Sequence, residues 1–280
     1  MIDLLPQWLR EGLSEDVMFW LGYLTNGKHL AWYASVRFTL FAAVAGAAVA
    51  LAMGLLGATL RNSRLLPVRL IGAGYTNMTR GIPDVLFFIF FPLAFEQTVE
   101  WVMSRSLCSA EEIATAVLWP PCPAANIHFD TFQYLLLASV SLGIVYGAFA
   151  ANVIFGAMHS VAPGQIEAAR AFGMSDRQVN WRIRIRQMWI YALPGLSNVW
   201  MLLIKSTSLL SLLQITDIVR WANVLGSPNF LPTAGLVHPD WRWQYYMVLL
   251  VFYIILTFLS EKGFTALRRR VGRGMITVED

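Results

Sequence analysis

Apolar runs and polar segments alternate along this chain of 280 residues, and the apolar runs are long enough to cross a bilayer. A membrane-spanning α-helix needs ~20 mostly apolar residues. Five stretches meet this requirement, over residues 38–60, 70–101, 134–158, 189–213 and 243–263. The pattern therefore predicts an all-α integral membrane protein whose single transmembrane domain covers residues 36–265.

Two of the predicted spans have distinctive interiors. The first is rich in alanine and carries Gly54 and Gly57, small residues that let helices approach closely. The second is interrupted by Arg80, Pro83 and Pro92. Backbone groups freed by such a break must be satisfied within protein, because lipid offers them no hydrogen bonds. We therefore expect one long, broken helix whose polar start packs against the rest of the chain.

Composition supports a membrane protein and excludes most soluble classes. The chain is 57% hydrophobic and 14% charged, which lies outside the range of soluble domains. Its net charge of +4 does not indicate nucleic acid, because the basic residues gather beside apolar spans and not on one soluble face. Residues 1–17 contain acidic residues and lack a basic n-region, so no cleavable signal peptide is predicted. For residues 1–35 two alternatives stay open: an amphipathic helix on the membrane surface, or a frayed terminus.

The distribution of arginine and lysine predicts the orientation. Cytoplasmic loops carry an excess of these residues. They concentrate in residues 61–80, 160–188 and the segment after Lys262, and they are sparse on the other side. The rule places the loop 160–188 and the tail 266–280 in the cytoplasm, and the N-terminus and the loop 104–133 in the periplasm. The lipid bilayer of the inner membrane is thus the first predicted partner.

The loop 160–188 is a polar, arginine-rich island between two apolar spans. Its pattern predicts two short helices, one over residues 165–172 and a second that begins after Ser175 and Asp176, which are suited to capping it. Gly173 supplies the break between them. Such a loop, with small and apolar residues beside its charges, is suited to docking into a groove.

A resemblance to a known family rests on this loop. Glu167, Ala168, Ala169 and Gly173 are similar to the E-A-A-x-x-x-G signature of inner-membrane permease subunits of ATP-binding-cassette importers. Residues 75–83 resemble the Y-x-x-x-x-R-G-x-P stretch of polar-amino-acid permeases, and residues 192–198 and 204–211 resemble two further segments of that group. The chain looks most like the histidine, lysine, arginine and ornithine branch, with opine permeases close by. It departs at Arg186, where the family usually has proline.

The resemblance implies a type I importer permease fold and a set of partners. These are an ATP-binding subunit, itself a dimer, a second related permease subunit and a periplasmic solute-binding protein. The loop would be the cytoplasmic coupling helix that docks on the ATPase; the alternative is a loop lying on lipid headgroups, which so many arginines would favour. The residues that the resemblance assigns to ATPase coupling are Glu167, Ala168, Ala169, Phe172 and Gly173.

No feature of the sequence predicts an enzyme. The chain has no G-x-x-x-x-G-K-[ST] phosphate-binding loop, and its four histidines are scattered. ATP and magnesium are therefore expected on the partner ATPase, and neither a cofactor nor a metal is expected on this chain. Cys108 and Cys122 fall in the predicted periplasmic loop, where a disulfide or two free thiols are both compatible with the sequence.

Polar residues within spans are the natural candidates for a translocation path, because a charge facing lipid is unfavourable. The alternative for the hydroxyls is that they bond to their own backbone or join helices. Where the family has a glutamate and an arginine, this chain has Asn152 and Phe155, so a second permease subunit is expected to bind the substrate, or else the solute is less basic. The candidates are Asn152, Lys205, Ser206, Thr207 and Ser211, together with Glu96, Glu100 and Asn198.

The sequence thus predicts the permease subunit of an importer for polar, basic amino acids or opines. Two other classes remain open: a secondary transporter and a non-transporting membrane scaffold, neither of which needs an ATPase partner. An inverted internal repeat would favour the secondary transporter, and the chain shows none.

Overall fold

The computed structural model describes residues 14–213 and 215–272, and these are almost wholly helical. Five helices are long and apolar enough to cross a membrane, as predicted. They are α3 (Gly27–Arg61), α5 (Asp84–Leu107), α7 (Thr131–His159), a continuous rod ending in α10 (Ile185–Ser206) and η4 (Thr207–Leu213), and α12 (Arg242–Val271). The shorter helices are α2 (Glu15–Leu24), α4 (Leu66–Gly81), α6 (Ala110–Thr115), η2 (Pro123–Ala125), α8 (Pro163–Ala171), α9 (Asp176–Val179), η3 (Asn180–Arg184), α11 (Ile218–Gly226) and η5 (Pro232–Ala234).

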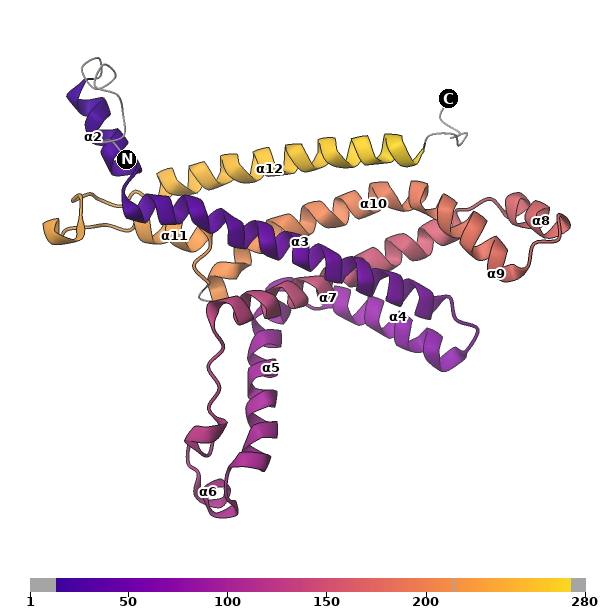
Figure 1. Ribbon diagram of the computed structural model, residues 1–280, viewed down its shortest axis with the longest axis horizontal. Coiled ribbons are helices and arrows are strands. Elements are labelled where there is room, and N and C mark those ends of the chain that lie inside the picture. Colours follow the sequence, from indigo (N-terminus) through magenta and orange to yellow (C-terminus); the bar gives the residue numbers. More distant parts are fainter. Residues whose placement is uncertain (1–13, 214, 273–280) are drawn as a thin grey trace.

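Helix α7 lies at the centre of the molecule, and α3 packs along it (Figure 1). In the most apolar stretch of α7, 67% of the residues are buried, which is a larger share than in the other spans of the described chain. The two helices touch through small residues. A Cβ added at Gly54 would lie 2.7 Å from Ala150 Cβ, and one added at Gly143 would lie 2.4 Å from Val49 Cβ. The predicted role of glycine in close helix packing is therefore correct for Gly54.

The second predicted span is two helices and not one. Helix α4 ends at Gly81, Ile82 is extended (φ −90°, ψ 133°), and Pro83 is the N-cap of α5. Proline has no N–H to donate and disfavours helical geometry in the residue before it, so the chain breaks here. Helix α4 lies against α3 and α7, whereas α5 turns sharply away (Figure 1). Residues 70–81 thus belong to a helix of their own.

The first and last long helices extend beyond the predicted limits of the transmembrane domain, residues 36 and 265. The first long helix begins at Gly27, where Asn26 Oδ1 accepts the His29 N–H at 3.0 Å, so residues 27–35 belong to this helix. Helix α12 continues to Val271, so residues 266–271 of the predicted tail are helical. Three arginines in its last turn complement the helix dipole. Of the predicted N-terminal segment 1–35, residues 1–13 lie outside the described residues, as do residues 273–280 of the tail.

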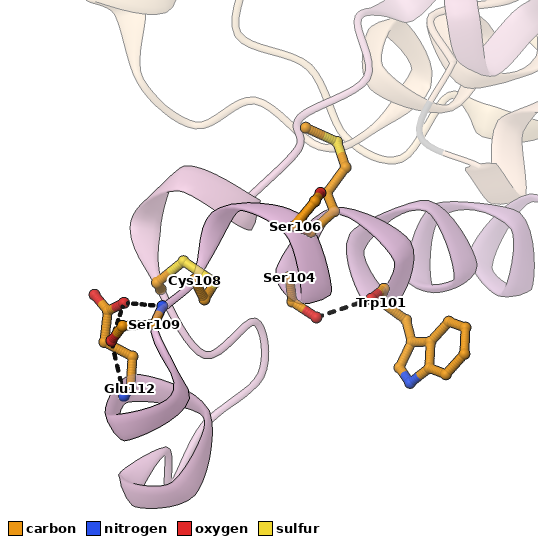
Figure 2. The surroundings of a disulfide bond; sticks show 8 residues. Trp101, Ser104, Ser106, Cys108, Ser109 and Glu112 are labelled. Atoms are coloured by element: carbon orange, nitrogen blue, oxygen red, sulfur yellow. Dashed lines mark hydrogen bonds between the residues drawn. A yellow bond between two sulfur atoms is a disulfide. The ribbon is translucent and has the colours of Figure 1, made fainter.

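The loop after α5 is closed by a disulfide. Cys108 and Cys122 are bonded, with their Cα atoms 5.8 Å apart, so the structure has the first of the two alternatives. Ser109 and Glu112 follow at once as a capping box that starts α6 (Figure 2). The Ser109 N–H donates to Glu112 Oε2 at 2.8 Å, and the hydrogen bonds from Ser109 lower the pKa of the Glu112 carboxyl. Local capping and the covalent link together define a compact loop.

Candidate functional site

The loop 160–188, for which a coupling role is predicted and which is called the coupling loop below, has the two-helix form expected from its sequence. Helix α8 begins with Pro163, whose missing N–H is harmless in a first turn. Gly173 follows α8 with φ +79°, a conformation that L-residues with side chains rarely adopt. Ser175 then caps α9 in a second capping box, in which the Ser175 N–H donates to Gln178 Oε1 at 2.9 Å. Gly173 therefore separates the two helices because its backbone adopts a left-handed conformation.

The outer surface of the coupling loop differs from the expectation at one position. Glu167 and Ala168 are exposed, and Phe172 is 90% exposed, so a large aromatic ring stands at the tip. Ala169 is only 7% exposed, because α8 turns that face toward the rest of the chain. Ala169 is therefore not on the exposed surface of the loop, and its part in coupling stays a prediction; the exposed residues of the predicted set are Glu167, Ala168 and Phe172.

The loop is tied to a long helical rod. Arg170 and Asp176 form an ion pair at 2.9 Å, which links α8 to the start of α9. From Asp176 the chain stays helical to Leu213, passing through one π-helical turn, η3. Arg186 lies within this rod, so the absence of the family proline coincides with an unbroken helix here. The loop and α10 are therefore joined by a continuous helical segment and by this ion pair.

A polar cluster lies near the other end of this rod. The Tyr146 hydroxyl donates to Asp84 Oδ2 at 2.9 Å and also forms a hydrogen bond with Ser206. Because the phenol has one proton, Ser206 is the donor in the second bond. Asp84 lies in the first turn of α5, Tyr146 in the middle of α7 and Ser206 at the end of α10, so three spans meet here. Tyr146 is 2% exposed, so the cluster is anchored within the core.

Asp84 brings an uncompensated negative charge to this cluster. Within residues 14–213 and 215–272, neither the Arg170–Asp176 nor the Arg242–Asp240 ion pair includes Asp84, and no salt bridge to this carboxylate is formed. The N-terminus of a helix favours an anion, which helps to keep the carboxylate in place. A carboxylate held inside the membrane region without a cationic partner can bind a cation that arrives from elsewhere.

The other hydroxyls expected in the path bond to their own backbone. Thr207 Oγ1 donates to the Ile204 carbonyl at 2.7 Å, and Ser211 Oγ donates to the Ser208 carbonyl at 3.1 Å. These bonds match the alternative that the sequence left open. Two of the candidate hydroxyls also reach another span of the described chain: Ser206 bonds to Tyr146 on α7, and Thr207 Oγ1 lies 3.4 Å from the Tyr253 hydroxyl on α12. Lys205 is exposed, and its ammonium has no hydrogen-bond or ion-pair partner among residues 14–213 and 215–272.

The remaining acidic candidates lie further along α5. Glu96 accepts a hydrogen bond from the Tyr134 hydroxyl, and Glu100 is 8% exposed. Asn198 on α10 is exposed. Asp84 was missing from the candidates, although an acid directly after Pro83, at the start of an apolar run, was the signal that could have identified it.

Asn152 is engaged by an arginine from a neighbouring helix. Its Oδ1 accepts a hydrogen bond from the guanidinium of Arg61, at the end of α3, and that guanidinium lies 4.2 Å from the centre of the Phe155 ring. Arg61 thus contacts both positions at which the chain departs from the pattern it resembles. The arrangement joins α3 to α7 and gives Asn152 a packing role.

Replacing Asn152 with alanine is expected to leave uptake within about twofold of the parent. The change removes one charge-assisted hydrogen bond, which contributes roughly 1.5–3 kcal/mol when buried and less when partly exposed. Arg61 would keep its contact with Phe155. Initial uptake rates and the thermal unfolding of the purified complex would be measured together. A collapse of uptake without loss of stability would show that Asn152 belongs to the translocation path.

Comparison with known proteins decides to which class of membrane protein the chain belongs. Residues 46–273 match the family described as "Binding-protein-dependent transport system inner membrane component". The chain belongs to this family. It is a non-catalytic, multi-pass permease subunit of the inner membrane, and the ATPase is a separate subunit. Membership also implies a binding protein as a partner.

Relatives and solved structures agree with the family. The permease is 30% identical over 239 residues to the histidine/lysine/arginine/ornithine transport system permease protein HisQ of Escherichia coli, covering 85% of this chain and 91% of that one. It is 28% identical to the octopine transport system permease protein OccQ of Rhizobium radiobacter, covering 91% and 96%. A crystal structure of an amino acid ABC transporter with histidines has the same fold, with a TM-score of 0.65 at 19% identity, covering 92% of the permease and 100% of that chain.

Proposed function

We propose that this permease subunit carries basic amino acids or opines from a periplasmic binding protein into the cytoplasm. The observation that carries the proposal is the Asp84 carboxylate, which is held by Tyr146 beside Ser206 at a junction of three spans. A cationic side chain that enters a medium of low dielectric constant needs an opposite charge. The names of the HisQ and OccQ relatives, which specify basic amino acids and octopine, support the same class of solute.

The coupling loop is proposed to receive the ATPase. Glu167, Ala168 and Phe172 are exposed on it, and Gly173 sets the angle between its two helices. The ion pair between Arg170 and Asp176 connects that surface to the rod that ends near Ser206. In this proposal, closure of the ATPase moves the loop, and the rod transmits the movement to the polar cluster at its far end.

The proposed assembly contains a second, related permease subunit. Support comes from the position of Asn152, where the resembled pattern has a glutamate, and from its engagement by Arg61. The binding protein would dock on the periplasmic side, on the loops 104–131 and 216–240. This orientation places the N-terminus in the periplasm and the C-terminus in the cytoplasm, in accordance with the positive-inside rule.

Co-purification tests the assembly. The tagged chain would be isolated from its native host in a mild detergent, and its partners identified by mass spectrometry. We expect an ATP-binding subunit and a second permease of the same family, with ATP hydrolysis stimulated by the loaded binding protein. Recovery of the ATPase alone would contradict the heterodimer. Absence of any ATPase, under conditions that preserve a control importer, would contradict the coupling loop.

A further inference from the structure

A groove of about 400 Å³ runs between α12 and the helices α3, α7 and α10. Its lining residues are all apolar, and they include Ala47 on α3, Trp189, Leu196 and Trp200 on α10, and Phe264 and Val271 on α12. Helix α12 extends alongside α10 (Figure 1), and the Trp200 and Phe264 ring centres lie 6.4 Å apart. The buried residues of α12 are Tyr245 and Leu249, both near its start. The described chain therefore leaves the groove open along the rest of α12.

The dimensions of the groove limit what can fill it. Water would find no polar partner on an apolar lining, and an empty space would lose dispersion contacts. From Trp189 to Leu203 the lining follows α10 for roughly 21 Å, at a helical rise of ~1.5 Å per residue, which exceeds the ~15 Å depth of one leaflet of hydrocarbon. A helix at least ~10 Å wide would occupy ~1,600 Å³ over that length. The volume therefore favours a lipid acyl chain over a helix of another subunit.

Positive charge gathers at one end of the groove. Helix α12 ends near the start of α10 (Figure 1), and its last turn contains Arg268, Arg269 and Arg270. Arg186 lies almost one turn before Trp189, on the face of α10 that lines the groove. It is exposed and has no hydrogen-bond or ion-pair partner among residues 14–213 and 215–272. Because Cα–Cβ bonds tilt toward the N-terminus of a helix, its guanidinium points past the end of the groove.

We propose that this groove binds one acyl chain of an anionic phospholipid, whose phosphate group lies on Arg186 and the arginines that end α12. Arginine binds phosphate through two parallel N–H···O hydrogen bonds. Basic residues at the end of a span also attract anionic lipid headgroups. The site accounts for Arg186, at which the chain departs from the pattern it resembles. A lipid bound there would join α12 to α10, which continues from the coupling loop.

Native mass spectrometry of the permease, co-purified with its partners in a mild detergent, tests the proposal. The probes are phosphatidylglycerol and phosphatidylcholine with identical acyl chains, one anionic and one zwitterionic. We expect phosphatidylglycerol to bind more tightly, and Arg186→Gln to weaken its binding by about fivefold, the typical effect of one basic residue at an anionic membrane. Arg177→Gln is the matched control, because Arg177 is exposed on α9 of the same rod and is absent from the lining.

A second pair of variants tests the acyl-chain part of the site. Ala47→Phe places a ring in the groove and is expected to weaken phosphatidylglycerol binding to a similar degree. Ala48→Phe is its control, since Ala48 is the next residue, is exposed and does not line the groove. Should Ala47→Phe fail to assemble, phosphatidylglycerol with a photoactivatable acyl chain would be cross-linked to the parent complex. The label is then expected on lining residues such as Leu196 and Leu267.

The outcomes are separable. Equal binding of the two lipids, or binding that Arg186→Gln leaves unchanged, would contradict the headgroup site. Cross-linking that misses the lining residues would show that another subunit covers the groove, and this too would overturn the proposal. Lipid binding is measured without transport, so a negative result here leaves the proposed import function intact.

Discussion

Asp84→Asn is expected to reduce uptake of a basic amino acid by at least about 100-fold while the permease still inserts and assembles. In the proposed function the partner of Asp84 is the cationic side chain of the substrate; losing one partner of such a pair inside the path costs ~3 kcal/mol, and each 1.4 kcal/mol is about tenfold in a rate or binding constant. Asparagine has nearly the same shape as aspartate, and its carbonyl oxygen can still accept the hydrogen bond from the Tyr146 hydroxyl. The loss would therefore report the charge and not the packing.

Two variants control for a general defect in α5. Asp84→Glu keeps the charge and is expected to retain a large part of the uptake. Glu96→Gln neutralises another carboxylate of the same helix that also accepts a hydrogen bond from a tyrosine hydroxyl, that of Tyr134, and it should have a much smaller effect. Uptake would be measured with labelled substrate in cells that lack competing importers. Normal uptake by the Asp84→Asn permease would contradict the role of the carboxylate.

Features encoded by neighbouring residues were predictable from the sequence. The Gly173 break and the Ser175 cap depend on residues within the same turn, so local rules place them correctly. The five spans were also predictable, because each is defined by a run of neighbouring hydrophobic residues. The break at Pro83 was also visible, but the sequence did not show that α4 folds back along α3 while α5 leaves in another direction.

Features that depend on distant residues were not predictable. The hydrogen bonds of Tyr146 connect residues 62 and 60 positions apart, so no local pattern identifies the Asp84 cluster. The orientation of α8 against the body of the protein decides that Ala169 is buried, and the sequence of the loop does not contain that information. The candidate hydroxyls of Thr207 and Ser211 lie where the chain tightens into the 3-10 helix η4, and they bond to nearby carbonyls there.

Gly173→Val is expected to lower the ATP hydrolysis stimulated by the binding protein by about tenfold or more. A Cβ at this position would meet nothing within 4 Å, so the substitution creates no steric clash with neighbouring groups. The obstacle is the φ of +79°, which is strongly unfavourable for a β-branched residue and costs ~1–3 kcal/mol. The loop would populate other conformations, and its apparent affinity for the ATPase would fall in proportion to the docking-competent fraction.

Gly164→Val is the matched control for this effect. Gly164 lies in the first turn of α8 of the same loop, a Cβ added there also meets nothing within 4 Å, and its backbone is not in the left-handed region. Valine at Gly164 therefore changes the size of the side chain to the same degree without the conformational penalty. Hydrolysis by purified complexes in nanodiscs would be compared at matched permease content. Equal activity of the two variants would show that the angle set by Gly173 is not required, whereas a defect confined to Gly173→Val would assign coupling to the left-handed turn between α8 and α9.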